Sequence, residues 1–464
     1  MSELWRLSAK ELTDGYASGD FTPAEATQAV LERTSTLNEK LNCFCLVDPD
    51  RALADAAAST QRWRAGTALS PIDGVPTSIK DLLLAEGWPT LFGSLTTDPD
   101  QAWNADAPAV GNLRRGGAIF FGKTTTPEWG HKGATDSRLH GITRNPWNTD
   151  LTPGGSSGGA AAALVSGSGP LAIGSDGGGS CRTPANFCGV VGLKPTHGRV
   201  PVWPPSTWGH LTTPGPMART VADAAQMLRL MSRPDIRDPL TRPDNPFDPV
   251  TGMNEGVAGL RIALSPGFGH PVKKEIADAV VRAAQTFSDM GAGVEEVSPD
   301  VGDAIELFRT YFFVGAAITM KNIPKHRHAL LEDLFRQVAE VGAQITATDY
   351  VEAVRATTEL RQRMGVFHQT YDLILTATNS VLPFPVGMAT PPEDADGKWG
   401  NFSPTLFPIN LSGQPAITVP CDRASNGLPI GLQLVAAAGR EDLLFRAALA
   451  FERTSGFANQ VAPI

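Results

Sequence analysis

Residues 153–199 carry the pattern from which the fold can be inferred, PGGSSGGAAAALVSGSGPLAIGSDGGGSCRTPANFCGVVGLKPTHGR. The stretch contains two clusters of glycine and serine: GGSSGG, which includes Ser156, and DGGGS, which ends at Ser180. AAAALV, a strong helix former, follows the first cluster, and the apolar LAIG, typical of a strand, precedes the second. A helix that leads into a strand in this way favours an α/β fold.

The second cluster has the backbone composition of an anion-binding turn. Gly177, Gly178, Gly179 and Ser180 supply four consecutive N–H groups, and glycine allows the close approach that lets such groups converge on one oxygen. The pattern predicts an oxyanion hole for a tetrahedral intermediate, with Ser180 as the nucleophile. Taken alone, DGGGS is equally compatible with a glycine-rich turn and an exposed serine.

A serine nucleophile needs a base, and neither cluster contains a histidine. Lys80 ends an apolar stretch within GVPTSIKDLL (74–83), where burial would disfavour its charged form and make it a base. A single lysine at the end of a strand is more often a solvated charge. Lys80 is therefore a candidate base that needs support from its surroundings.

The rest of the chain alternates in the same way. Helices are expected over residues 5–65, with Thr22 as an N-cap and Pro23 in the first turn, and a mostly helical insertion around 272–370. The Pro- and Asp-rich segment 232–256 predicts an exposed connection where a subdomain boundary could fall. We nevertheless expect one domain over 1–464, because short apolar runs typical of strands recur to the end of the chain: 72–79, 118–121, 171–174, 260–264, 373–376, 416–419 and 430–435.

Two short motifs match other enzyme classes. GAIFFGKT (117–124) fits the phosphate-loop pattern, but the residues between its glycines are strand-like rather than small and flexible, so a buried strand is the better interpretation. GGSSG (154–158) fits the GxSxG nucleophile elbow, which requires a later acid and histidine. His197 and His210 are available, but a single five-residue match is weak evidence.

Composition excludes several classes of function. The net charge is −9 and no basic run occurs, which disfavours nucleic acid and anionic membranes as partners. The N-terminus lacks the features of a signal peptide, and the five cysteines form no CxxC pair, so we expect a cytoplasmic protein with reduced thiols. Cys181 is interpreted as a small buried side chain. We expect neither a metal nor another cofactor.

Taken together, the motifs resemble the amidase signature family, whose hallmark is GGSSGG, then D-x-GGS-x-R-x-PA, then GLKPTxGR. The similarity extends over nearly the whole chain and implies an α/β/α sandwich around a large mixed β-sheet. Further matching segments are IDGVPTSIKDLL, GKTTTPEWG, TRNPWN, GPMARTVADA, YDLILTAT and SGQPAITVP.

The resemblance also implies roles for individual residues. Ser180 falls on the nucleophile, Ser156 on a proton-relay serine in a cis peptide after Gly155, and Lys80 on the base. The amides of residues 177–180 fall on the oxyanion hole. Ser157 and Asp176 match positions that support the lysine, and Arg182 matches an arginine that braces the site. Gly177 departs from the family, which commonly has threonine there.

The implied reaction is hydrolysis of a small-molecule amide to an acid and an amine or ammonia, through a seryl acyl-enzyme. The alternative is the amidase subunit of a tRNA-dependent amidotransferase, but its usual SxxENxxYG is replaced by ATDSRLHG (134–141). A non-catalytic scaffold is disfavoured because the triad positions are intact. The sequence leaves a homodimer open.

An aryl or otherwise hydrophobic amide is the substrate class we expect. Aromatic side chains offer large apolar contact areas to such a ligand, although packing in the core is the commoner role for any one of them. The candidates for a substrate pocket are Trp129, Trp203, Trp208, Phe187 and Phe402.

Overall fold

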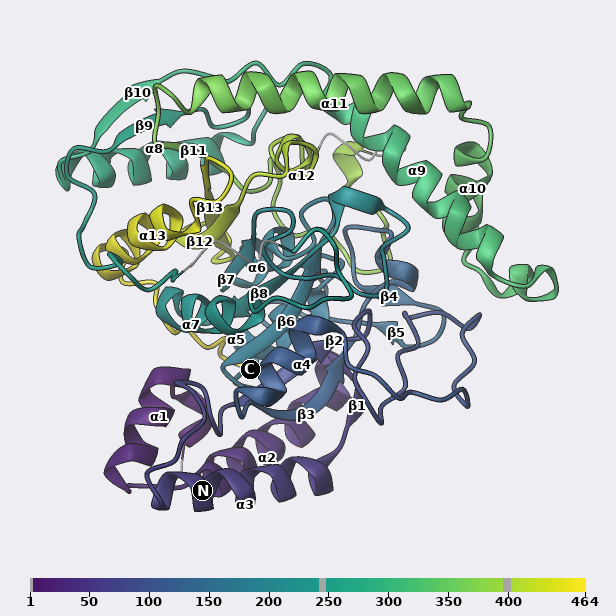
Figure 1. Ribbon diagram of the computed structural model, residues 1–464. Helices are drawn as coiled ribbons and strands as arrows, with labels where there is room; N and C mark the ends of the chain where they lie inside the picture. Colours follow the sequence, from purple (N-terminus) through teal and green to yellow (C-terminus); the bar gives the residue numbers. More distant parts are fainter. Residues whose placement is uncertain (1–2, 242–247, 395–401) are drawn as a thin grey trace.

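A single large mixed sheet runs through the molecule (Figure 1). The computed structural model describes residues 3–241, 248–394 and 402–464. Within them the sheet has 11 strands in the order β1-β3-β2-β6-β8-β7-β12-β13-β11-β9-β10. The strands are β1 (Phe44–Val47), β2 (Pro76–Lys80), β3 (Ile119–Thr124), β6 (Leu171–Asp176), β7 (Val191–Lys194), β8 (Thr213–Ala218), β9 (Arg261–Leu264), β10 (Gly293–Glu296), β11 (Leu373–Ala377), β12 (Ala416–Arg423) and β13 (Pro429–Ala436). A small hairpin, β4 (Asp136–Ser137) with β5 (Gly141–Ile142), lies apart from this sheet.

Helices cover both faces of the sheet because side chains alternate along each buried strand. Leu171 and Ile173 belong to one apolar cluster and Ala172 to another. The first face packs against α1 (Ala9–Ser18), α4 (Pro108–Arg115), α7 (Val221–Met231), α8 (Lys274–Asp289) and α13 (Glu441–Ser455). The second packs against α2 (Pro23–Leu41), α3 (Pro49–Arg64), α5 (Gly158–Ser166), α6 (Arg182–Cys188), α9 (Ala304–Asn322), α11 (Ala347–Phe367) and α12 (Phe407–Ser412). The predicted α/β/α sandwich is confirmed.

Most strands coincide with the apolar runs of the sequence, and the exceptions have physical reasons. The expectation of helices throughout 5–65 is wrong at β1, a four-residue strand between α2 and α3. β8 has the sequence TPGPMA yet pairs with both β6 and β7. Its two prolines argue against a central strand, which is why the sequence did not predict it. The GAIFFGKT motif forms β3, as expected for a buried strand.

Helices dominate the segment between β9 and β11, as predicted for 272–370, although β10 also lies within it. α9 and α10 (Asp333–Gly342) pack against each other at one side of the molecule, and α11 extends along its edge (Figure 1). Of the Pro-rich connection 232–256, residues 242–247 lie outside the described residues. At the other end of the chain, Thr22 caps α2 through a reciprocal bond with Glu25, and Pro23 starts the helix as predicted.

No helix in the described ranges combines the length and the apolar character that a membrane crossing requires.

Candidate active site

Lys80 is the last residue of β2, which runs parallel to β3 on one side and to β6 on the other. Asp176 is the last residue of β6. The carboxyl ends of neighbouring parallel strands meet at one edge of a sheet, where ligands of α/β proteins commonly bind. All five residues of β2 are buried although three of them are polar, so the lysine amine lies in the interior.

Within the described ranges, the amine of Lys80 contacts three serines and no carboxylate. Its Nζ lies 2.7 Å from Ser156 Oγ, 2.9 Å from Ser157 Oγ and 3.0 Å from Ser175 Oγ. Burial of the side chain lowers the pKa of Lys80 to about 7, because a charged amine loses its hydration there. Near neutral pH about half of the molecules then carry a neutral amine that can accept a proton.

The first serine cluster forms the loop before α5. The Gly155–Ser156 peptide is cis, as the resemblance implies. A Cβ atom on Gly155 would stand 2.7 Å from the carbonyl oxygen of Ala134, so the loop is tightly enclosed. The Ser157 N–H donates to the Ser180 carbonyl at 3.1 Å. This bond ties the two serine clusters together.

The second cluster forms the turn after β6. The N–H of Gly179 donates to Asp176 Oδ1 at 2.8 Å, so it is already satisfied, in contrast to the expectation of four free donors. For the N–H groups of Gly177, Gly178 and Ser180, no acceptor occurs in the described part of the chain. Three amides around the nucleophile are thus available to an oxyanion.

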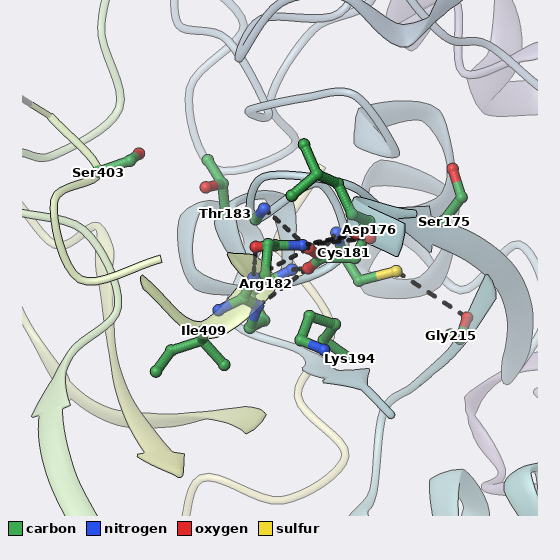
Figure 2. A network of polar contacts seen from close by, with 12 residues as sticks. Ser175, Asp176, Cys181, Arg182, Thr183, Lys194, Gly215, Ser403 and Ile409 are labelled. Atoms are coloured by element: carbon green, nitrogen blue, oxygen red, sulfur yellow. Dashed lines mark hydrogen bonds and ion pairs between the residues drawn. The ribbon is translucent and has the colours of Figure 1, made fainter. Parts of the chain in front are cut away.

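Asp176 and Arg182 form a fully buried ion pair that supports this turn (Figure 2). Arg182 donates to both carboxylate oxygens of Asp176 at 2.9 Å and also to Asn410 and Gln433. Burial by itself would raise the pKa of Asp176, but the charge and hydrogen bonds of Arg182 hold it well below its usual range. The hydrogen bonds of Asp176 go to the turn and to Arg182 rather than to Lys80, which differs from its expected place in the lysine network.

A cavity of about 370 Å³ opens onto these groups. Ser156, Gly177, Gly178 and Ser180 lie in its wall. No hydrogen bond joins the hydroxyls of Ser156 and Ser180 among the described residues, and catalytic hydrogen bonds commonly tighten only when substrate is bound. The remaining wall is mainly apolar, including Leu82, Leu83, Leu84, Phe92, Phe308, Phe312, Ile323 and Phe407.

The three tryptophans named from the sequence all line this cavity, as does Phe402. Trp129 stacks on Phe92 with ring centroids 4.6 Å apart, and Trp208 stacks on Phe312 at 5.7 Å. Trp203 precedes a cis proline and lies under the guanidinium of Arg237. Phe187 is different: it is fully buried and packs edge-on against Phe384. The suggestion that Phe187 faces a ligand is therefore wrong.

Two further residues of the site did not stand out in the sequence. Ser175 contacts Lys80 because β6 continues two residues beyond the predicted end at Gly174. His131 lines the cavity, and burial lowers the pKa of its imidazole to about 3, so the ring is neutral at ordinary pH. The period of two along β6 could have indicated Ser175, but nothing near His131 in the sequence marks it.

One group of potential metal ligands occurs in the described chain, formed by Cys45, Asp81 and His140. Lys123 Nζ lies 2.9 Å from Asp81 Oδ1, so this carboxylate already has a cationic partner. The charge of Lys123 opposes a metal ion at the same place. We therefore assign no metal or cofactor role to these residues.

Comparison with known proteins agrees with this geometry. Residues 25–445 match the amidase family, described as Amidase. This chain is an amidase signature protein. It is 35% identical to an acylamidase of Rhodococcus erythropolis over 98% of this chain and 96% of the relative. It is also 32% identical to one of the subunits of the glutamyl-tRNA(Gln) amidotransferase of Alkaliphilus metalliredigens, strain QYMF, over 97% of this chain and 96% of that one.

The fold agrees with solved amidase signature structures as well. A bacterial aryl acylamidase superimposes with a TM-score of 0.89 and 28% identity, covering 97% of this chain and 96% of that chain. The protein is therefore an amide-hydrolysing enzyme of the amidase signature family, whose members act on small amides.

Proposed function

We propose that this amidase hydrolyses hydrophobic amides through a covalent intermediate on Ser180, with Ser156 as the proton relay and Lys80 as the base. The contact of 2.7 Å between Lys80 Nζ and Ser156 Oγ, at the wall of an apolar cavity, carries this proposal. A fully buried lysine with a pKa of about 7 is suited to take up and return a proton near neutral pH.

In the first half of the reaction, Ser180 Oγ attacks the carbonyl carbon of the amide. Its proton passes to Ser156 Oγ, whose own proton passes to neutral Lys80. The carbonyl oxygen becomes an oxyanion that the amides of Gly177, Gly178 and Ser180 stabilise. Each such donor typically contributes about 10²- to 10³-fold to the rate.

The second half uses the same path in reverse. Lys80 returns its proton through Ser156 to the leaving nitrogen, the C–N bond breaks, and an ester on Ser180 remains. Water then attacks that ester while Ser156 relays its proton to Lys80. The C–O bond to Ser180 breaks, the proton returns through Ser156 to Ser180 Oγ, and the acid leaves. Ser157 and Ser175 hold the lysine amine in place during these transfers, and Arg182 with Asp176 holds the turn that carries Ser180.

The aromatic wall supports an aryl or other hydrophobic amide as substrate. Trp129, Trp203 and Trp208 contribute large, stiff apolar surfaces. The relatives named as an acylamidase and an aryl acylamidase also favour such a substrate. Strands from both ends of the chain share the sheet that holds the site, which supports a single domain over 1–464.

The experiment is an assay of the purified protein against aryl, alkyl and dipeptide amides, in the absence of glutamine and tRNA. Release of amine or ammonia by the wild type, and not by Ser180→Ala, is the expected result. If glutamine is hydrolysed and glutaminyl-tRNA forms only when glutamine, a glutamyl-tRNA and partner subunits are supplied together, the protein is an amidotransferase component instead. If neither condition yields product, the catalytic assignment is wrong.

A further inference from the structure

The glycines in the cavity wall fall into two kinds. The fold itself requires most of them, because a Cβ atom would collide with a neighbour or the backbone has a positive φ. At Gly133 the added atom would lie 2.6 Å from Phe402, and at Gly178 it would lie 2.5 Å from Phe308. Gly130 has a φ of +70°, and its Cβ would meet Leu82 at 2.7 Å. At these positions an added side chain would displace a neighbouring residue or strain the backbone.

Gly177 is the exception among the cavity-lining glycines of the described chain. Its φ is not positive, and an added Cβ would meet only Thr212 Oγ1, at 3.3 Å. That hydroxyl accepts a hydrogen bond from Ser206 Oγ at 3.1 Å, and a contact of 3.3 Å asks it to shift only slightly. Neither backbone conformation nor packing therefore requires glycine here, although the residue lies in the wall of the catalytic cavity.

The place of Gly177 relative to the reacting atoms indicates which part of a substrate lies beside it. Ser156 Oγ stands next to Gly130, since a Cβ there would be 3.1 Å from it. The leaving nitrogen receives its proton from Ser156 and so must occupy the Gly130 side. The other substituent of the carbonyl carbon, the acyl chain, then extends into the rest of the cavity, whose wall includes Gly177 and Thr212.

We propose that the missing side chain at Gly177 creates an acyl subsite, which admits substrates branched or bulky at the carbon next to the scissile carbonyl. This inference rests on the proposed function and adds a specificity-determining residue to it. Gly177 keeps its backbone N–H whatever its side chain, so substitution changes the space in the subsite while leaving the donor present. A single added methyl group in an apolar pocket changes discrimination by about 10- to 200-fold.

The test compares wild type with Gly177→Ala on anilides that differ only in acyl size: acetyl, isobutyryl and pivaloyl. We expect the ratio of kcat/KM for pivaloyl over acetyl to fall by about 10- to 200-fold in the variant. Using a ratio cancels any change in the oxyanion hole that affects all substrates equally. Gly365→Ala is the matched control, because Gly365 is exposed, has no positive φ, has no atom near an added Cβ, and lies on α11, away from the cavity.

A second readout does not depend on turnover. Methyl-, isopropyl- and tert-butylboronic acid form tetrahedral adducts with a reactive serine, and their binding can be measured by thermal shift. Weaker binding of the larger boronates to Gly177→Ala, with Gly365→Ala like wild type, supports the subsite. An equal loss for every acyl size, or no loss, would overturn it. If the boronates bind the wild type and their binding to Gly177→Ala weakens with size, the subsite is supported. If the wild type nevertheless cleaves no amide, only the proposed function is refuted.

Discussion

The pH dependence of hydrolysis should report the ionisation of Lys80. Its pKa is lowered to about 7 by burial, so below that pH the amine is protonated and cannot accept the proton of Ser156. Activity must therefore rise with pH. For a base with this pKa, kcat/KM increases about tenfold between pH 6 and pH 8, whereas an unshifted lysine would give about 100-fold over the same range.

Substituting Lys80 by alanine separates its two roles. As base it activates Ser180, and as acid it protonates the leaving nitrogen, which an amine needs more than a phenoxide does. With about 10² for each role, Lys80→Ala should lose about 10⁴-fold on an anilide and about 10²-fold on the matched phenyl ester. The assay is kcat/KM for both substrates from pH 5 to pH 9, in wild type and variant.

Lys194 provides the control for this experiment, because burial lowers the pKa of its amine to about 7 as well. Its Nζ donates to the carbonyl of Pro195, and it is absent from the described wall of the cavity. Lys194→Met should keep the increase of kcat/KM with pH, whereas Lys80→Ala should lose this increase. The reasoning fails if kcat/KM of Lys80→Ala still increases with pH and the variant loses activity equally on amide and ester. Lys80 would then have a structural role only.

The other predictions concern the nucleophile and its turn. Ser180→Ala should reduce turnover by about 10⁶-fold while the thermal midpoint stays unchanged, and a fluorophosphonate should label only the wild type; near-normal activity would rule Ser180 out. Gly179→Ala should lose more kcat than Gly177→Thr, because Gly179 has a φ of +105° and its Cβ would lie 2.3 Å from Leu406; similar, mild losses would argue against a constrained turn. Asp176→Asn should lower the free energy of unfolding by about 3 to 5 kcal/mol, because it leaves the buried Arg182 without its anion; an unchanged urea midpoint would contradict this.

The chain's local patterns predicted most of the sheet, because buried strands are apolar runs bounded by glycine and proline. These patterns missed strands whose pairing with neighbouring strands outweighs their own amino-acid composition. β8 contains two prolines, which cannot donate backbone hydrogen bonds. It nevertheless lies between β6 and β7, because its other residues still pair with these two strands. β1 is too short to interrupt the helical pattern around it.

The site was harder to predict than the sheet, because its residues come from separate strands and loops. Ser156, Ser180 and Lys80 could be named because their motifs are distinctive. The occupation of the Gly179 amide by Asp176 could not be foreseen, since it depends on how the turn after β6 bends. Nor could the exclusion of Phe187 from the cavity, because an aromatic residue on a helix gives no sign of which neighbour it faces.

Arg182 depends on hydrogen-bond partners that are synthesised much later in the chain than the catalytic residues. The ribosome has synthesised both serines and the lysine by residue 180, but the Arg182 guanidinium that pairs with Asp176 also bonds to Asn410 and Gln433. A nascent or truncated chain that ends before these residues contains every catalytic group and still lacks the partners of a fully buried cation. Hydrolysis should consequently begin only once translation is nearly complete, so that no partly made enzyme cleaves amides in the cell.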